Sequence, residues 1–241
     1  MQDIDFWLDD VSAANMGIML QEPITFSAVT KRMNTVQVVG KSGDLHYDEG
    51  AYNNITGNAE CFALSEGVTA QMADIMSFLF GTSGYRKLQT SDDTMHYREA
   101  TVISGGETET RLATLDPFTI NFNCKPFRRL LSGDDAVYIE NGDTIINPTG
   151  FDAEPLIYFS AIDAGEIHIG DNTISVLSTL PDYLVMDCEL QTVYPESSMK
   201  KYGYNGYIRT AQYPVLGLGE TVIEWTGGVN VSKIIPRWRT L

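Results

Sequence analysis

Short segments in which apolar and polar residues alternate recur along most of this chain, and they restrict its possible folds more than any other feature. Residues 117–123 place Phe118, Ile120 and Phe122 on one face of an extended backbone. Gly, Asn, Asp or Pro bounds the comparable segments at residues 35–39, 167–170, 173–177, 183–190 and 221–225. Strands this short, with turn signals about every ten residues, predict a mainly β fold of sandwiches or barrels.

One segment has the period of a helix instead. A helix over about residues 69–80 is predicted, with Thr69 suited to its N-cap and Gly81 to its end. Its apolar residues recur at i, i+3, i+4 and i+7 and are Met72, Ile75, Met76 and Leu79. We expect this stripe to pack on a sheet. The alternative is a helix that binds a membrane or a partner, but its polar face carries Asp74 and no basic residue to meet lipid.

The charge of the chain argues against several classes of protein. Its 241 residues include 32 acidic and 16 basic side chains, for a net charge of −16, and 43% of them are hydrophobic, which argues against wholesale disorder. Nucleic-acid binders cluster Lys and Arg against phosphates, whereas the largest basic clusters here are at 125–129 and 237–239. No apolar run reaches half of the roughly 20 residues that span a bilayer. We therefore expect neither specific DNA or RNA binding nor membrane insertion.

The N-terminal sequence and the cysteines favour a reducing compartment. The first ten residues are acidic where a signal peptide would be basic, so we expect no cleavable secretion signal. Cys61, Cys124 and Cys188 lie about 63 residues apart and form no CxxC spacing. This usage predicts buried free thiols in preference to a disulfide framework or a zinc site.

A domain boundary is predicted near residues 128–137, where a polar stretch separates two series of strands. We expect an N-terminal domain over residues 1–130, which contains the helix, and a C-terminal domain over residues 131–241. The first carries 10 basic and 17 acidic residues and the second 6 and 15, so the net charges are −7 and −9. Neither half is therefore a basic arm or an acidic tail.

The sequence carries no recognisable catalytic, cofactor-binding or metal-binding motif. Its histidines occur in no metal-ligand spacing and are His46, His96 and His168. Residues 81–84 lack the spacing of a nucleophile elbow, and they follow a predicted helix where an elbow follows a strand. Residues 217–219 precede a predicted strand and are therefore a turn and not a glycine-rich phosphate-binding loop, which follows a strand and precedes a helix. Pairs of carboxylates arise by chance among 32 acidic residues. We therefore assign no catalytic, cofactor or metal residue.

A tyrosine-rich segment is a candidate binding site. Tyr202, Tyr204 and Tyr207 alternate loosely within the Gly-containing stretch 201–210. Exposed aromatic rings with a polar tip suit the binding of carbohydrate. The same pattern is typical of an irregular loop or an interface strand, and we favour this second interpretation.

Five longer segments carry patterns in a fixed order. Residues 38–54 contain a strand, then Gly-basic-x-Gly-Asp-Leu, an acidic turn and a Tyr. Residues 74–102 contain a helix ending in an aromatic-Leu pair, a glycine loop, a Lys-Leu strand and a Tyr-Arg-x-Ala strand, and residues 117–129 follow with one strand. Residues 145–162 carry an Asn-x-x-Gly turn and a Pro-led strand, and residues 213–241 end in Ile-x-Pro-Arg-Trp. Together these segments resemble the distal tail protein (Dit) family of long, non-contractile-tailed phages (siphophages).

The resemblance covers nearly the whole chain and departs from the family pattern in one turn, at residues 217–220, where Pro-Gly and Asn would be expected. It implies an N-terminal β-sandwich or partial barrel with one α-helix, six copies of which close a ring, and a C-terminal jelly-roll, galectin-like β-sandwich. At this length the chain resembles the short form without an inserted carbohydrate-binding module.

The same resemblance implies a place in the virion, after synthesis in the host cytoplasm. The ring would be the hub at the distal end of the tail, through which DNA passes. The implied partners are further copies of the chain, the tail tube protein, the tape measure protein and tail-tip or receptor-binding proteins. An acidic lumen that repels DNA phosphates is one hypothesis for the net charge, and solubility is the other.

Two other function classes stay open. A carbohydrate-binding module would contact cell-wall polysaccharide through the three tyrosines of the C-terminal domain. A hydrolase would act through paired carboxylates, and we rank it below both other readings because no spacing singles out a pair.

Overall fold

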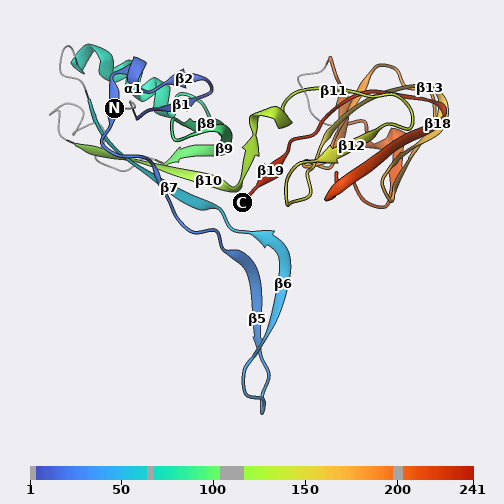
Figure 1. Cartoon of the computed structure of the whole chain (residues 1–241), viewed down its shortest axis with the longest axis horizontal. Coiled ribbons are helices and arrows are strands. Elements are labelled where there is room, and N and C mark those ends of the chain that lie inside the picture. The colour runs from blue at the N-terminus through green and yellow to red at the C-terminus, as the bar shows by residue number, and fades with distance from the viewer. Residues whose placement is uncertain (1–3, 64–67, 104–116, 198–202) are drawn as a thin grey trace. The chain divides into compact units, whose positions relative to one another are not determined.

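The structure is a computed structural model that describes residues 4–63, 68–103, 117–197 and 203–241, with the side chains of the helix from residue 73 onward. The chain divides into two compact units, Met1–Arg128 together with Leu241, and Arg129–Thr240. Both are built mainly from strands, as the alternating pattern predicts (Figure 1). No helix in the described ranges is long and apolar enough to cross a membrane.

The main sheet of the first unit contains strands in the order β2-β1-β8-β9-β10-β7-β3, with β4 paired to β7. These strands are β1 (Phe6–Leu8), β2 (Val11–Ser12), β3 (Ile18–Leu20), β4 (Thr25–Phe26), β7 (Ile55–Ala63), β8 (Arg86–Thr90), β9 (Asp93–Ile103) and β10 (Phe118–Leu130). Strands β10 and β7 pair antiparallel, with Phe122 opposite Gly57. Phe118, Ile120 and Phe122 are 3%, 2% and 0% exposed, which confirms the predicted buried face.

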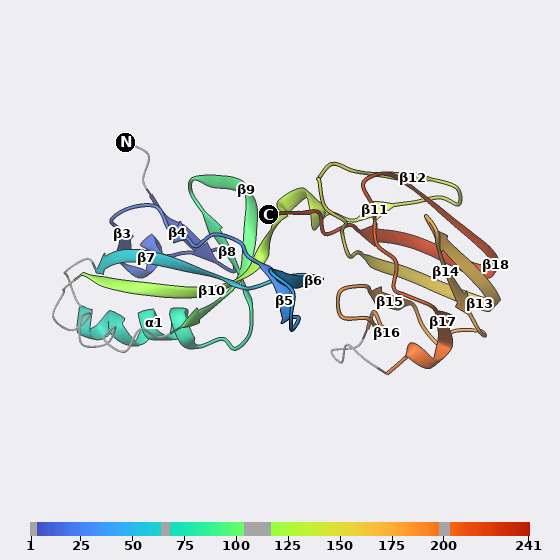
Figure 2. The same ribbon diagram turned by 90° about the horizontal axis from the view of Figure 1, so that it is seen from below.

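Helix α1 (Val68–Phe80) packs on one face of this sheet, beside β10 in Figure 2. Within the predicted stripe, Ile75 and Leu79 are buried and Met76 packs partly buried against the same core. Asp74 is exposed, as predicted. The side chains of the predicted N-cap, Thr69, and of the first stripe residue, Met72, lie outside the described residues.

Aromatic rings connect the helix to the sheet. The ring of Phe6 meets Phe122 edge-on, with centroids 5.7 Å apart, and lies 6.4 Å from the ring of Phe78 in α1. The helix ends where Gly81 N–H donates to the Ser77 carbonyl at 2.8 Å. The apolar stripe therefore faces the core of the first unit, as predicted for a helix that packs on a sheet.

A second, two-stranded sheet extends from the first unit, and among the described strands its two members pair only with each other (Figure 1). It consists of β5 (Lys31–Gln37) and β6 (Asp44–Tyr52), and we call residues 31–52 the arm. The strand predicted at residues 35–39 lies in the arm but ends at Gln37, because the chain turns from residue 39 onward.

The second unit contains one sheet in the order β11-β18-β13-β14-β17, with β12 paired to β18, and β15 paired to both β13 and β16. Its strands are β11 (Val137–Tyr138), β12 (Thr144–Asn147), β13 (Leu156–Ile169), β14 (Asn172–Val176), β15 (Leu184–Asp187), β16 (Thr192–Pro195), β17 (Ile208–Thr210) and β18 (Gly219–Ile235). The last strand, β19 (Arg239–Thr240), is not part of this sheet and pairs with β10. Side chains from β12 through β18 meet in a single apolar cluster. The sheet therefore curls around one core.

Three short 3-10 helices complete the described elements, namely η1 (Ala14–Met16), η2 (Leu131–Gly133) and η3 (Asn205–Tyr207).

Glycines allow the long strands β13 and β18 to bend together. The register shifts between Ala161 and Gly165, opposite Gly227. A Cβ on Gly165 would lie 2.2 Å from the Thr226 carbonyl oxygen, and Gly227 has a φ of +70°. No side chain fits at the first position and few L residues adopt the second conformation, so this bulge depends on glycine.

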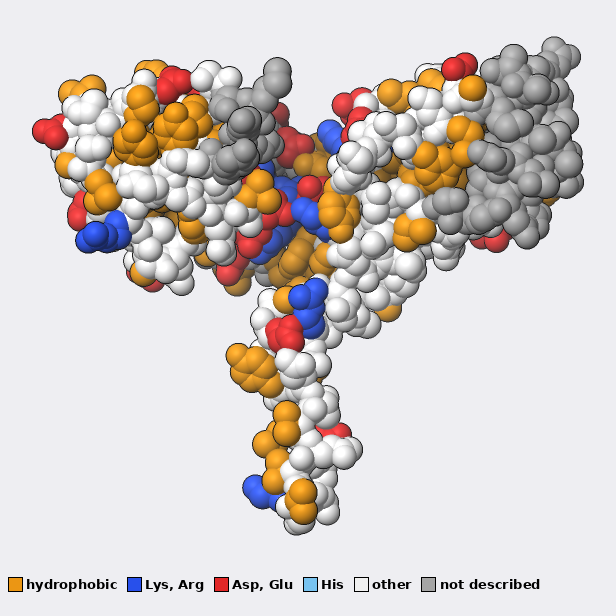
Figure 3. Space-filling view, turned by 180° about the vertical axis from the view of Figure 1, so that it is seen from behind, with side chains coloured by type: hydrophobic (Ala, Val, Ile, Leu, Met, Phe, Trp, Pro, Cys, Tyr) orange, Lys and Arg blue, Asp and Glu red, His pale blue; other side chains and the backbone are white. Residues whose placement is uncertain are grey.

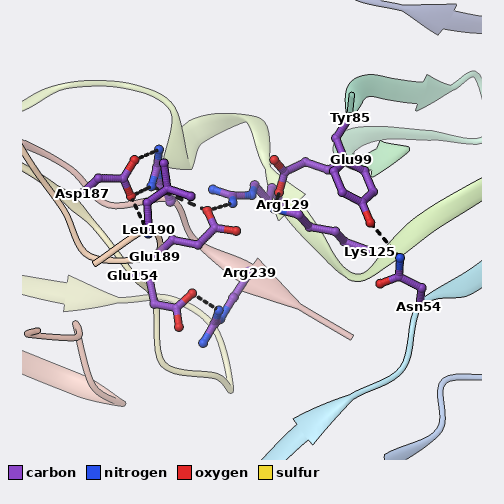
Figure 4. A network of polar contacts seen from close by, with 11 residues as sticks. Asn54, Tyr85, Glu99, Lys125, Arg129, Glu154, Asp187, Glu189, Leu190 and Arg239 are labelled. Atoms are coloured by element: carbon purple, nitrogen blue, oxygen red, sulfur yellow. Dashed lines mark hydrogen bonds and ion pairs between the residues drawn. The ribbon is translucent and has the colours of Figure 1, made fainter. Parts of the chain in front are cut away.

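A buried ion pair fixes the segment between β18 and β19 onto β15. The Asp187 side chain is 0% exposed, and its two oxygens lie 2.8 and 3.3 Å from Nη1 and Nη2 of Arg237. Leu190 N–H also donates to Asp187 at 3.1 Å (Figure 4). Neighbouring pairs join Arg129 to Glu189 at 2.6 Å and Arg239 to Glu154 at 2.6 Å.

Candidate interaction surfaces

The arm has one apolar and one polar face. Val36 pairs with Leu45 and Asn34 with Tyr47 across its two strands. Because successive residues of a strand point to opposite faces, Val36, Leu45 and Tyr47 share one face. The opposite face carries mainly polar residues, among them Thr35 and its partner His46, whose side chains are 3.3 Å apart.

No described residue of the first unit covers the apolar face of the arm. Val36, Leu45 and Tyr47 are 55%, 60% and 68% exposed, and Val39 at the turn is fully exposed. Hydrophobic side chains accordingly follow the length of the arm in Figure 3. An isolated two-stranded hairpin is only marginally stable in water. An apolar face of this kind is typical of a surface that binds another protein.

The three histidines lie apart and have ordinary polar partners. His46 faces Thr35 on the arm, His96 Nδ1 lies 2.7 Å from Asp93, and His168 Nδ1 lies 3.1 Å from Thr173 Oγ1. Among the described residues no three His, Cys, Asp or Glu side chains converge to hold a metal ion.

The three cysteines are buried free thiols, as the sequence predicts. Burial raises the pKa of Cys61 to about 12 and the pKa of Cys124 to about 11, and it also raises the pKa of Cys188. The thiolate is the nucleophilic form of cysteine. None of these side chains is therefore set up as a nucleophile at neutral pH.

The described part of the tyrosine segment packs on the core of the second unit, to which it belongs. Tyr202 lies outside the described residues. The rings of Tyr204 and Tyr207 stack on each other, with centroids 5.6 Å apart and planes 18° from parallel, and both pack half-buried against the core. Between them Asn205 accepts a hydrogen bond from Val193 N–H at 2.7 Å. Each ring therefore uses one face on its neighbour, which leaves limited aromatic surface for a sugar.

Sequence reasoning recognised the strand at the start of the arm but not its apolar face. The signal was present in the alternation of Val36 with its neighbours and of Leu45 with Tyr47. Such alternation normally indicates a half-buried strand, and it does not reveal whether the unit that contains the strand also contains the layer that covers it.

Comparison with solved structures finds the same fold in a phage protein. The Dit protein of phage SPP1, described as a paradigm of the hub adsorption apparatus in phages that infect Gram-positive bacteria, is 12% identical to this chain. The TM-score is 0.66, and the match covers 99% of each chain. A chain of the phage P2 baseplate in its activated conformation with calcium is 9% identical, with a TM-score of 0.48 and coverage of 96% and 97%. No protein-family model and no curated protein matches the sequence. At the level of the fold, the Dit resemblance seen in the sequence is confirmed.

Proposed function

We propose that this chain is a structural protein of a phage virion, which forms a hexameric ring as the hub at the distal end of the tail. The ring connects the tail tube to the tail-tip or host-recognition apparatus. The fold shared with the SPP1 Dit protein supports this role, because it extends over 99% of both chains and includes both units. Identical folds can serve different functions, so the proposal also needs an observation on this chain itself.

The uncovered apolar face of the arm is that observation. Val36, Leu45 and Tyr47 together present a β surface that is more than half exposed at each residue. A ring with closed cyclic symmetry needs two different, complementary faces on every subunit. The arm supplies one of them, because its apolar face needs a partner surface to become buried.

The charge of the chain adds a requirement to this assembly. Six copies at −16 bring a total of −96 into one ring, and this repulsion opposes closure unless the acidic residues face solvent or pair with cations. Apolar contacts avoid the problem, because they do not depend on charge. We propose that some of the acidic residues line the lumen of the ring, where they repel the phosphates of passing DNA and keep it from adhering.

The proposed partners are those of a connecting ring. They are further copies of the chain, the tail tube protein, the tape measure protein and the tail-tip or receptor-binding proteins. In this role the chain has no catalytic function. The chain is synthesised in the host cytoplasm before it enters the virion.

The oligomeric mass of the full chain tests the ring. Light scattering after size-exclusion chromatography should give about 160 kDa for six chains of 26.7 kDa, and negative-stain images should show sixfold rings. If the chain alone is monomeric, the measurement is repeated with the tail tube protein of the same phage. Failure to form a sixfold assembly in both experiments contradicts the proposal.

Two variants, each with one added charge on a different face of the arm, test whether the apolar face is the contact surface in the assembly. Burying a leucine contributes about 1.5–3 kcal/mol, and a carboxylate in its place adds a desolvation cost. Leu45→Glu should therefore shift assembly to at least tenfold higher concentration. The matched control is Thr35→Glu, which adds the same charge to the polar face and should leave assembly nearly unchanged. Equal effects of both variants would exclude the apolar face as the contact surface.

Carbohydrate binding by the second unit is the alternative function. Its described candidates, Tyr204 and Tyr207, form an aromatic pair at the surface of η3. Titration of the full chain with host wall polysaccharide tests it, with a Tyr204→Ala/Tyr207→Ala variant and Tyr183→Ala as the control at an exposed tyrosine of the same unit. Saturable binding that only the double variant loses would favour this alternative.

A further inference from the structure

A cavity of about 380 Å³ lies beside β8 and β9 in the first unit, and the proposed role in a tail makes no use of it. Its apolar wall includes Leu88 and Tyr97, which are buried, whereas Asp92 in its lining is exposed. The cavity therefore runs from the surface to the core. Its volume falls in the range of about 300–1,000 Å³ that small-molecule sites occupy. Two arginines, Arg98 and Arg128, also line it, and we call it the guanidinium cavity.

Arg98 is a cation without a carboxylate partner among the described residues. Its Nη1 donates to the Pro126 carbonyl at 3.1 Å, and its guanidinium carbon lies 4.8 Å from the centre of the Phe26 ring. A guanidinium carries five N–H donors, so most of those on Arg98 have no acceptor in the described part of the chain. Burial and the nearby charge of Arg128 both lower the pKa of Arg98. The negative charge of Asp93 raises the pKa of Arg98, but burial and Arg128 outweigh it.

Arg128 supplies a second unsatisfied donor to the same cavity. Its Nη1 lies 3.0 Å from Asp93 Oδ2, and its Nη2 donates to the Leu241 carbonyl at 3.0 Å. Its Nε is buried and has no hydrogen-bond partner among the residues that the structure describes. Asp93 cannot serve both arginines fully, because its other oxygen lies 2.7 Å from His96 Nδ1. Buried donors in native structures normally have a partner, so an acceptor is missing here.

We propose that the guanidinium cavity binds one carboxylate group, which accepts hydrogen bonds from Arg98 and from Nε of Arg128. Planar guanidinium groups match the geometry of a carboxylate. Asp92 and Asp93 also line the cavity and would repel a dianion such as phosphate or sulfate, so the proposed ligand carries a single negative charge. The apolar wall formed with Phe26 suits a ligand whose carboxylate is joined to an aromatic or aliphatic group.

This chemistry has two possible sources, a free carboxylic acid and an acidic side chain of a protein segment. Isothermal titration of the full chain distinguishes them with phenylacetate in one arm and a capped Phe-Glu-Phe peptide in the other. Phenylacetamide and the corresponding Phe-Gln-Phe peptide are the neutral controls. The proposal predicts saturable one-to-one binding of at least one carboxylate probe, and at least tenfold weaker binding of its neutral control.

Substitutions then assign the binding to this cavity. Arg98→Gln should weaken carboxylate binding at least tenfold, whereas Arg32→Gln, at an exposed arginine of the arm, should leave it unchanged. Circular dichroism establishes that each variant is folded, and if Arg98→Gln does not fold, Arg98→Lys replaces it, with the forked geometry lost and the charge kept. Binding equal to that of the neutral controls, binding unaffected at Arg98, or equally tight binding of sulfate would each overturn the proposal.

Discussion

Substituting Arg237 with alanine should strongly destabilise the second unit, because it leaves one buried carboxylate without its cation. The Asp187 side chain is 0% exposed, and both its oxygens lie within 3.3 Å of the Arg237 guanidinium. The Leu190 N–H at 3.1 Å would remain as its hydrogen-bond partner. Removing one member of a buried ion pair costs about 3–5 kcal/mol. This is a large part of the roughly 5–15 kcal/mol by which a domain is stable.

The backbone at Arg237 refines this expectation. Its φ of +58° lies in the left-handed region, which costs a residue with a side chain about 1–2 kcal/mol. Alanine retains that strain, whereas glycine relieves it. Glycine also lowers the stability of the folded state by about 0.4–1 kcal/mol, because it gives the unfolded chain more conformational freedom. Arg237→Gly should therefore be about 0.5–1 kcal/mol less destabilising than Arg237→Ala, although both variants lack the guanidinium.

Urea denaturation of the full chain measures these differences through tryptophan fluorescence and circular dichroism. Trp238 follows Arg237 and is only 7% exposed, so its emission reports unfolding of the second unit. The matched control is Arg209→Ala, which removes an arginine from an exposed position of β17 and should change stability by less than about 0.5 kcal/mol. A loss below about 1 kcal/mol for Arg237→Ala, or a loss as large in the control, would refute the reasoning.

Three further predictions concern packing, reactivity and acid stability. Gly165→Ala should lower the melting temperature of the second unit measured by calorimetry, because the new Cβ would lie 2.2 Å from the Thr226 carbonyl oxygen, and an unchanged melting temperature would contradict the described bulge. The three buried thiols, with the pKa of Cys61 raised to about 12, should react with iodoacetamide at pH 8 only after urea unfolding, as mass spectrometry would detect. Burial raises the pKa of Asp9, but hydrogen bonds from Arg86 and from a backbone N–H outweigh it, so the folded pKa lies below the usual value near 3.8. The stabilisation from this carboxylate is therefore present above its ordinary pKa and lost as the pH falls through the lowered one, and Asp9→Asn should flatten the stability profile below about pH 4.

Local patterns predicted the regular elements of this protein well. The alternation of Phe118, Ile120 and Phe122 placed all three on the buried face of β10, and the helix predicted over residues 69–80 runs from residue 68 to residue 80. These predictions succeed because the periods of strands and helices are set by backbone geometry within a few residues. The helix also ends before Gly81, where the sequence placed its end.

The candidate sites depend on residues that the sequence does not bring together. Arg98 and Arg128 are 30 positions apart and share one cavity only because β9 and β10 are neighbours in the sheet. Asp187 is one of 32 acidic residues, and nothing in its surrounding sequence marks it as the fully buried one. The three tyrosines were conspicuous in the sequence, yet two of them, Tyr204 and Tyr207, use part of their surface on each other and on the core. Pairing and burial across long separations decide such sites, and they are properties of the fold.

How well the arm is ordered should depend on the concentration of the protein that binds it. No residue of β5 is buried, so the first unit itself contributes little free energy to hold the strand pair in place. Whatever binds the arm stabilises its ordered form by mass action, to an extent that grows with the concentration of the binding partner. If that partner is a second copy, the amide protons of residues 31–52 exchange slowly in concentrated solution and quickly in dilute solution. Those of β10 exchange slowly in both.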